Sequence, residues 1–344
     1  MKLLQEELVK RGLDCAIFLN NEGVNPNLFY LIGYVGSGAL VVRPNDKPIL
    51  HVPARDLTEA KKINGVIISS GKKLVETLTE YKIRTGKIGI DFSNVSVRDF
   101  NNLKESLKCE FFDVSEFMEL MRVIKNDLEI DKIRKACKIT DNILNKFVKN
   151  FKKFKTEEEA GAFLVYETRL AGCDIAFELI VASGVNAAVP HHKSKGKINN
   201  GFCVVDFGIK FKGYCSDITR TIYFGVPSKS EEKKYYDLLM VQEKAISLVK
   251  DGALIREVCS EAETLLVRPL IHSLGHGLGI EVHEKPYVST NSKDILKEGM
   301  VITIEPGDYV EGKYGIRIED DVLVTSSGCE ILSKFSKRLI IIDI

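Results

Sequence analysis

Four acidic residues in the C-terminal half of the chain lie in or beside short apolar runs, and this placement limits what the chain can fold into. Asp206, Glu305 and Glu319 each lie in or at the end of a run with the composition of a buried strand, and Asp217 stands between two such runs. A carboxylate buried in a strand costs several kcal/mol unless a cation or good hydrogen-bond donors meet it. One such acid is most simply explained by a salt bridge or a turn cap. Four together are harder to explain in that way.

The overall charge excludes several classes of partner. The 344 residues include 49 Lys and Arg against 48 Asp and Glu, a net charge of +1, so the chain has no field to hold a polyanion. The longest apolar runs, such as residues 339–342, are far shorter than the ~20 residues of a membrane helix. We therefore expect neither a nucleic-acid partner nor a membrane partner.

The N-terminus and the cysteines favour a cytoplasmic location. Glu6 and Glu7 stand where a secretory signal would have its apolar centre. The eight cysteines are dispersed and form no CxxC pair, so we expect buried, reduced thiols rather than a disulfide or zinc framework.

Length and patterning predict two domains. Residues 1–120 alternate short apolar runs with amphipathic stretches, which predicts a small α/β domain. The expected strands there are residues 15–19, 39–42, 48–52, 66–69 and 88–92, and the expected helices are residues 56–62, 72–81 and 97–107. Residues 121–126 form the expected linker.

Residues 127–344 combine helical patterns with further strands. Helices are expected at residues 128–151, 230–249 and 254–265, with Asp127 as the N-cap of the first. Thr156 and Glu159 have the spacing of a capping box and predict one more helix. The expected strands are residues 179–182, 202–207, 218–224, 301–305, 315–319, 321–325 and 339–342.

Five of the six histidines fall in two short stretches, around residues 191–192 and 272–283. Three glycines between His272 and His283 argue against a helix there, and no HExxH motif is present. An extended glycine-rich segment would instead let the backbone approach a site closely while it presents His276 and His283. For His51 and His272 we expect hydrogen-bonded core positions. A nucleotide site is disfavoured because neither GxxxxGK[ST] nor a strand-borne GxGxxG with a later acid is present.

The ordered set of candidate residues resembles a known family. Five stretches carry the resemblance: residues 204–208, 216–221, 272–284, 304–307 and 315–320. They are similar to the metal-site motifs of peptidase family M24, the proline-directed metallopeptidases of the pita-bread superfamily. The prolidase (Xaa-Pro dipeptidase) and aminopeptidase P branch of that family fits best, because an α/β block precedes the motifs. The resemblance implies a creatinase/prolidase N-terminal domain, with a mixed sheet and helices, followed by an α+β pita-bread catalytic domain.

The resemblance also implies a ligand set for two divalent metal ions. In the family pattern Asp206 is bidentate, Asp217 and Glu319 bridge the metals, and His276 and Glu305 bind one metal. Four carboxylates nearly cancel two divalent charges, and this donor set suits Mn²⁺ or Co²⁺, with Zn²⁺ possible. Catalysis would use a metal-bridging hydroxide.

Further residues match other parts of the family site. Glu305 is also the expected proton shuttle. His191 and His283 match histidines that hydrogen-bond the substrate, and Arg317 matches an arginine beside the bridging glutamate. Phe177 and Tyr309 are the expected pocket residues.

The expected substrate is a small peptide with proline at its second position, first of all an Xaa-Pro dipeptide. The alternative is removal of the first residue from longer Xaa-Pro peptides, as in aminopeptidase P. Many prolidases have an arginine where this chain has Tyr287, which weakens the dipeptidase interpretation. A non-catalytic pita-bread binding protein is a third possibility, opposed by the presence of all five ligand positions. The family generally forms homodimers, and we expect one here.

Overall fold

The chain divides between Arg122 and Val123 into two units, in a computed structural model that describes residues 1–21, 23–83 and 85–343. This division falls inside the predicted linker, residues 121–126. None of the described helices combines the length and apolar composition that crossing a bilayer requires.

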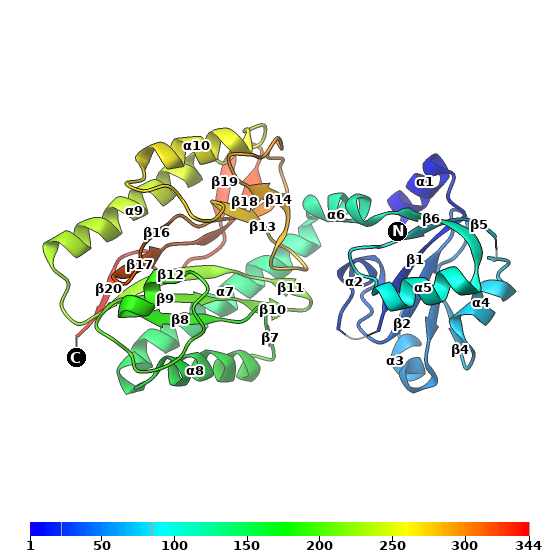
Figure 1. Ribbon diagram of the computed structural model, residues 1–344, viewed down its shortest axis with the longest axis horizontal. Coiled ribbons are helices and arrows are strands. Elements are labelled where there is room, and N and C mark those ends of the chain that lie inside the picture. Colours follow the sequence, from blue (N-terminus) through cyan, green and yellow to red (C-terminus); the bar gives the residue numbers. More distant parts are fainter. Residues whose placement is uncertain (22, 84, 344) are drawn as a thin grey trace. The chain divides into compact units, whose positions relative to one another are not determined.

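The first unit is a six-stranded mixed sheet with helices on both faces (Figure 1). Its strands, in the spatial order β4-β3-β2-β1-β5-β6, are β1 (Cys15–Asn20), β2 (Gly38–Val42), β3 (Ile49–Val52), β4 (Ile67–Ser70), β5 (Thr85–Ile90) and β6 (Lys108–Asp113). Its helices are α1 (Lys2–Arg11), α2 (Pro26–Ile32), α3 (Leu57–Ala60), α4 (Leu74–Glu80), α5 (Val97–Ser106) and α6 (Ser115–Val123).

Strand β1 shows why both faces of this sheet are covered. Ala16 and Phe18 face one core cluster, whereas Cys15 and Ile17 face the other, so successive side chains are buried on opposite sides. The five strands and three helices predicted for this unit are present. The sequence patterns did not predict α1, α2, α6 or β6; β6 has only half-buried or exposed residues, so it lacks an apolar pattern.

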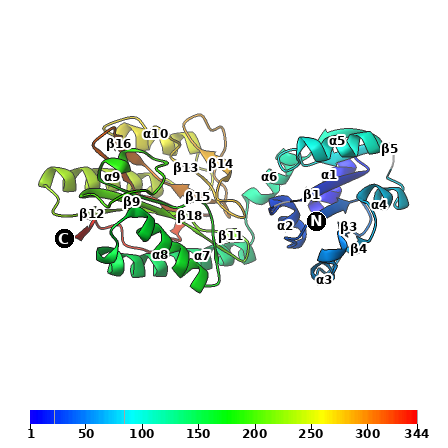
Figure 2. The same cartoon turned by 60° about the horizontal axis from the view of Figure 1, so that its bottom comes forward.

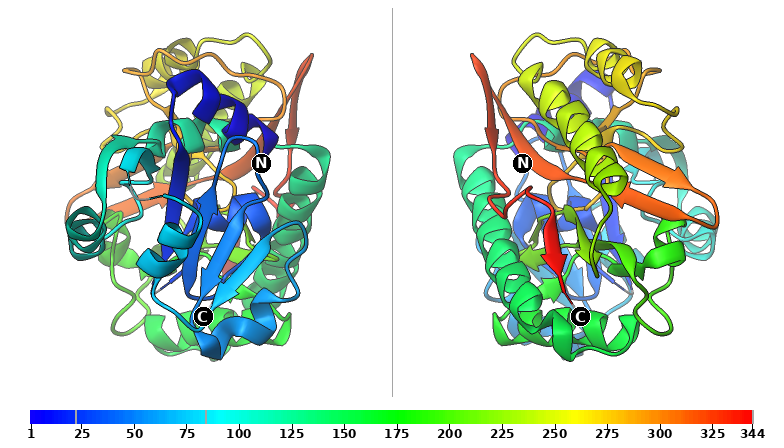
Figure 3. Two further views of the ribbon diagram at one scale, coloured as in Figure 1. Left: turned by 90° about the vertical axis from the view of Figure 1, so that its right-hand side faces the viewer. Right: turned by 90° about the vertical axis from the view of Figure 1, so that its left-hand side faces the viewer.

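The second unit places helices on opposite sides of its strands (Figure 2). The helices are α7 (Asp127–Asn150), α8 (Glu157–Leu170), α9 (Lys229–Ser247) and α10 (Ile255–Leu265). Helices α7 and α8 pack on the sheet β20-β12-β9-β8, and α9 and α10 pack on the sheet β14-β13-β15-β18-β19. The right-hand view of Figure 3 shows α7 and α9 on either side of the strands.

The strands of this unit form four sheets. They are β7 (Asp174–Ile175), β8 (Ile180–Ser183), β9 (Gly201–Phe207), β10 (Ile209–Phe211), β11 (Tyr214–Cys215), β12 (Ile218–Phe224), β13 (Gly275–Gly277), β14 (Glu284–Val288), β15 (Val301–Ile304), β16 (Gly307–Val310), β17 (Tyr314–Arg317), β18 (Asp320–Thr325), β19 (Gly328–Ile331) and β20 (Ile340–Ile342). Strands β7, β10 and β11 form a small third sheet, and β16 and β17 a hairpin.

Two predicted helix starts differ in detail from the structure. The N-cap of α7 is Asn126 rather than Asp127, because Asn126 has an extended backbone and its Oδ1 accepts from the N–H groups of Leu128 and Glu129. At α8, Thr156 accepts from the N–H of Glu159 as predicted. The Glu159 carboxylate, however, accepts from the N–H of Lys155, so the capping box is incomplete.

Candidate metal centre

Neighbouring strands bring the first two acids to the centre of the second unit. In β9, Cys203, Val205 and Phe207 face the core against α7 and α8, so Asp206 points to the other side of the sheet. Asp217 directly precedes β12, which pairs with β9 so that Thr219 lies opposite Asp206. The backbone N–H of Asp217 donates to the Oδ2 of buried Asp321 at 2.9 Å, which fixes the turn.

The other three predicted ligands come from the second sheet and the β17–β18 turn. His276 is the middle residue of β13, Glu305 follows β15, and Glu319 lies between β17 and β18. Glycines permit this arrangement: a Cβ on Gly275 would lie 2.0 Å from the carbonyl oxygen of Thr303, and one on Gly277 would lie 2.2 Å from that of Lys285. The glycine-rich segment therefore packs directly against the backbones of the neighbouring strands β15 and β14.

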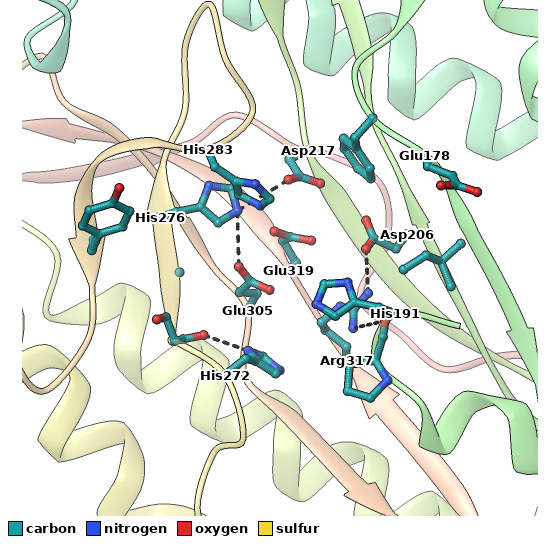
Figure 4. Close-up of a pocket in the computed structure, with 16 residues that line it drawn as sticks. Glu178, His191, Asp206, Asp217, His272, His276, His283, Glu305, Arg317 and Glu319 are labelled. Atoms are coloured by element: carbon teal, nitrogen blue, oxygen red, sulfur yellow. Dashed lines mark hydrogen bonds and ion pairs between the residues drawn. The ribbon is translucent and has the colours of Figure 1, made fainter. Parts of the chain in front are cut away.

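The five side chains point toward one another (Figure 4). Three overlapping groups have ligand atoms within 4.8 Å of one another: Asp206, Asp217 and Glu319; His276, Glu305 and Glu319; and Asp217, His276 and His283. The Nδ1 of His276 contacts the carbonyl oxygen of Gly277 at 3.1 Å, which places the ring proton on Nδ1. Its Nε2 lone pair then faces Glu305 Oε1 at 3.3 Å and Asp217 Oδ2 at 3.6 Å.

The pKa values of this cluster show that its carboxylates resist full ionisation unless positive charge lies beside them. Burial lowers the pKa of His276 to about 4, so its imidazole is neutral at pH 7 and its contacts with the carboxylates are not ion pairs. Burial, and next the neighbouring carboxylates, raise the pKa values of Asp217 and Glu319 well above their ordinary range. Burial likewise raises the pKa of Glu305 to about 7. Within the described residues, the buried Oδ1 atoms of Asp206 and Asp217 have no hydrogen-bond partner. Lone pairs without donors, facing one another, fit divalent metal ions.

Arg317 secures one side of the cluster. Its Nη2 donates to Asp206 Oδ2 at 2.6 Å, its Nε to Thr219 Oγ1 at 3.1 Å and its Nη1 to the Tyr309 hydroxyl at 2.7 Å. The residue is 4% exposed, so its charge acts at short range on Asp206. Arg317 and Glu319 both line the same cavity.

A cavity of about 410 Å³ opens onto the cluster. His191 and Phe177 line it as expected, and so does His283, whose ring lies 4.2 Å from that of His276 between centroids. Tyr309, an expected pocket residue, does not line it; its hydroxyl accepts from Arg317 Nη1 and contacts His272 Nε2 at 3.3 Å, and both of these partners do line the cavity.

Seven further residues line the cavity without having been predicted, among them Glu178, His272 and Tyr287. His272, expected in the core, lies at the cavity wall because the segment before β13 runs along its edge. Its place four residues before His276, in the same glycine-rich stretch, was the available signal. His51, by contrast, is buried and hydrogen-bonded to Thr77 as predicted.

Comparison with known families settles the classification. The family model described as metallopeptidase family M24 matches residues 131–326, and that of the Creatinase/Prolidase N-terminal domain matches residues 1–124. The chain belongs to metallopeptidase family M24. The predicted fold is thereby confirmed: a creatinase/prolidase N-terminal domain precedes an M24 pita-bread domain.

Relatives cover nearly the whole chain. The Xaa-Pro dipeptidase of Pyrococcus horikoshii is 34% identical over 352 residues, covering 99% of this chain and 98% of its own. The crystal structure of the prolidase from P. horikoshii OT3 matches with a TM-score of 0.90 at 33% identity, covering 98% and 99% of the two chains. An X-Pro aminopeptidase from Thermotoga maritima matches with a TM-score of 0.88 at 32% identity, covering 98% and 100%. Similarity to solved structures of this family therefore does not separate the two activities.

Proposed function

We propose that this chain hydrolyses the peptide bond that precedes proline, acting first of all on Xaa-Pro dipeptides. The observation that carries the proposal is the inward-facing set of four carboxylates and one neutral imidazole at a single cavity. Family M24 membership and relatives named Xaa-Pro dipeptidase support the substrate class. An Xaa-Pro bond lacks the N–H that ordinary peptidases bind, so its hydrolysis needs an enzyme with a pocket for the proline ring.

In this proposal the five donors hold two divalent ions. Following the family pattern, Asp217 and Glu319 would serve both ions, with Asp206 on one side and His276 and Glu305 on the other. Glu319 belongs both to the group with Asp206 and Asp217 and to the group with His276 and Glu305, which agrees with that pattern. Oxygen donors with a single imidazole suit Mn²⁺ or Co²⁺, and Zn²⁺ is a possible substitute. Bound divalent ions acidify water and polarise a carbonyl oxygen.

The remaining steps fall to the chain's own residues. Glu305 accepts and transfers a proton at its carboxylate, which lies at the cavity beside the other ligands. His191 and His283, at the cavity wall, hydrogen-bond the substrate. Arg317 keeps Asp206 oriented, and Phe177 offers an apolar surface to the substrate.

One observation favours the aminopeptidase alternative. A dipeptidase holds the substrate's C-terminal carboxylate, and Tyr287 stands where many prolidases have an arginine. Among the described residues that line the cavity, Arg317 is the sole lysine or arginine, and it already pairs with Asp206. A longer peptide would not need such a cation.

Hydrolysis assays on the metal-stripped and reloaded protein test the proposal. We expect release of proline from Leu-Pro and Met-Pro with Mn²⁺ or Co²⁺ and loss of activity with chelator. Faster cleavage of Leu-Pro-Pro than of Leu-Pro would select the aminopeptidase alternative. If a sample with two bound metal ions cleaves neither kind of peptide, the enzyme interpretation is wrong and a binding role remains.

Metal stoichiometry tests the ligand assignment separately. Glu319→Ala should abolish binding of the metal pair, whereas Glu311→Ala, at an exposed position, should retain it. Unchanged stoichiometry in Glu319→Ala would remove that residue from the site.

The homodimer and the cytoplasmic location remain predictions. The eight cysteines are free thiols, six of them buried, which agrees with a reducing compartment.

A further inference from the structure

His191 reaches the cavity from a long irregular segment. Residues 184–200 join β8 to β9 and contain only the short 3₁₀ helix η3 (Gly184–Ala188). Within the described part of the chain, the His191 imidazole makes no hydrogen bond of its own, and the residue is exposed at the cavity. Its position must therefore be set by neighbouring residues, because a loop of this kind has many accessible conformations.

Glu157, the first residue of α8, hydrogen-bonds several residues in and beside this segment. Its carboxylate is fully buried and accepts from the N–H and Oγ of Ser183 at 2.7 and 2.8 Å, from Asn186 Nδ2 at 3.1 Å, from His192 Nε2 at 2.8 Å and from the N–H of Lys195 at 3.0 Å. The positive end of the α8 dipole adds to the stabilisation of a carboxylate at this position. Five donors from residues 183–195 meet one side chain.

The residues on either side of His191 are held from two directions. His192 donates to Glu157, and the carbonyl oxygen of Pro190 accepts from Arg317 Nη1 at 3.5 Å. Arg317 in turn binds Asp206 of the metal cluster. The three residues 190–192 are thus held between α8 and the cluster, with the His191 side chain at the cavity.

We propose that Glu157 is a positioning residue that, through His192 and the 183–195 segment, holds His191 where it meets the substrate. This inference rests on the proposed function of His191. A displacement of about 1 Å in a catalytic group can lower the rate by about 100-fold. We therefore expect Glu157→Gln, which replaces one acceptor oxygen by a donor amide, to lower kcat/KM for Leu-Pro by about 10- to 100-fold.

The test is a double-mutant cycle with His191. If Glu157 acts by positioning His191, the double variant Glu157→Gln/His191→Ala should be no less active than His191→Ala alone, because the positioned group is already gone. A general structural defect would instead lower the activity of both backgrounds by the same factor. Glu159→Gln is the matched control, because Glu159 lies in the same helical turn, is exposed, and its carboxylate bonds the N–H of Lys155 ahead of the helix.

A second pair of variants covers the case in which Glu157→Gln fails to fold. His192→Gln keeps an N–H donor toward Glu157 and should retain activity, whereas His192→Phe loses the donor and should behave like Glu157→Gln. The proposal is overturned if His192→Gln and His192→Phe have equal activity. It is also overturned if Glu157→Gln lowers the activity of His191→Ala by the same factor as that of wild type, or if folded Glu157→Gln changes kcat/KM by less than about 3-fold.

A readout independent of turnover separates this proposal from the proposed function. With only six histidines in the chain, ¹⁵N-histidine NMR spectra can resolve the His191 imidazole, assigned by its loss in His191→Ala. Glu157→Gln should shift or broaden that resonance more than those of His51 and His272. If the His191 resonance is unchanged in Glu157→Gln, the positioning role is refuted, whether or not the wild-type protein cleaves a peptide. If the resonance shifts but the wild-type protein cleaves no peptide, only the proposed function is refuted.

Discussion

Glu305→Gln should stabilise the metal-free protein at pH 8 and destabilise the metal-loaded protein. Glu305 lies at the cavity, where burial raises the pKa of its carboxyl group from 4.5 to about 7. A group whose pKa is higher in the folded state binds its proton more tightly there. Its contribution to stability is therefore complete below about pH 4.5 and is lost as the pH rises through about 7.

The size of the effect follows from that pKa. A rise from 4.5 to about 7 corresponds to about 3 kcal/mol, of which about 2 to 3 kcal/mol falls between pH 5 and pH 8. Glutamine is neutral at every pH, so the free energy of unfolding of Glu305→Gln, relative to wild type, should rise by this amount over that range. Saturating Mn²⁺ reverses the order at pH 8, because the wild type gains binding energy through a carboxylate that the variant lacks.

Urea unfolding at pH 5, 6.5 and 8, first with chelator and then with Mn²⁺, measures both effects. Glu311→Gln, at an exposed position, is the matched control and should track the wild type throughout. The reasoning is refuted if Glu305→Gln is less stable than wild type at pH 8 without metal. It is also refuted if the two proteins keep the same stability difference from pH 5 to pH 8.

Two further substitutions test contacts that stabilise the second unit. Lys125 Nζ lies 2.8 Å from Glu284 Oε1 in an ion pair whose side chains are 1% and 3% exposed. Lys125→Met leaves the buried Glu284 carboxylate without this partner, so thermal and urea unfolding should show that the free energy of unfolding falls by about 3–5 kcal/mol. Adding Glu284→Gln should recover most of that loss. A loss below about 1 kcal/mol would show that Glu284 finds other compensation. Gly275→Ala places a Cβ against the backbone of β15, so the free energy of unfolding should fall by about 1–3 kcal/mol and calorimetry should show weaker Mn²⁺ binding. Gly328→Ala is the control, because its added Cβ meets open space, and it should change neither quantity. Full metal affinity in Gly275→Ala would show that β13 can shift without loss of His276.

Those parts of the structure that follow from local apolar patterns could be predicted from the sequence. The runs around Asp206 and Glu305 became β9 and β15, and an acid in such a run marks itself as unusual because burial of its charge needs compensation. The grouping of the five residues came from the family resemblance and not from the pattern. No local rule places Glu319 beside His276, since these residues come from different sheets or turns.

Other features depend on which segments meet in space. His272 looked like a core residue because a lone histidine usually is one, yet its neighbours in the fold leave it at the cavity wall. Tyr309 shows the opposite outcome: it was expected to line the pocket, but its hydroxyl bonds the Arg317 guanidinium and it is not among the residues that line the cavity. Both side chains are decided by the packing of the β16–β17 hairpin against the segment before β13, and neither residue's own surroundings in the sequence encode that packing.

Asp206 and Glu157 show which buried acids can be recognised from the sequence and which cannot. Both are acids with little or no exposure, but Asp206 lies among apolar neighbours, whereas Glu157 opens a run of three glutamates at the start of a helix. By its pattern Glu157 is interchangeable with Glu158 and Glu159, and all three suit the helix dipole. What distinguishes it is a set of donors 26 to 38 residues further along the chain, two of them backbone N–H groups that every residue type except proline possesses. A buried acid can therefore be recognised from sequence where its neighbours are apolar, and only from structure where backbone groups stabilise it.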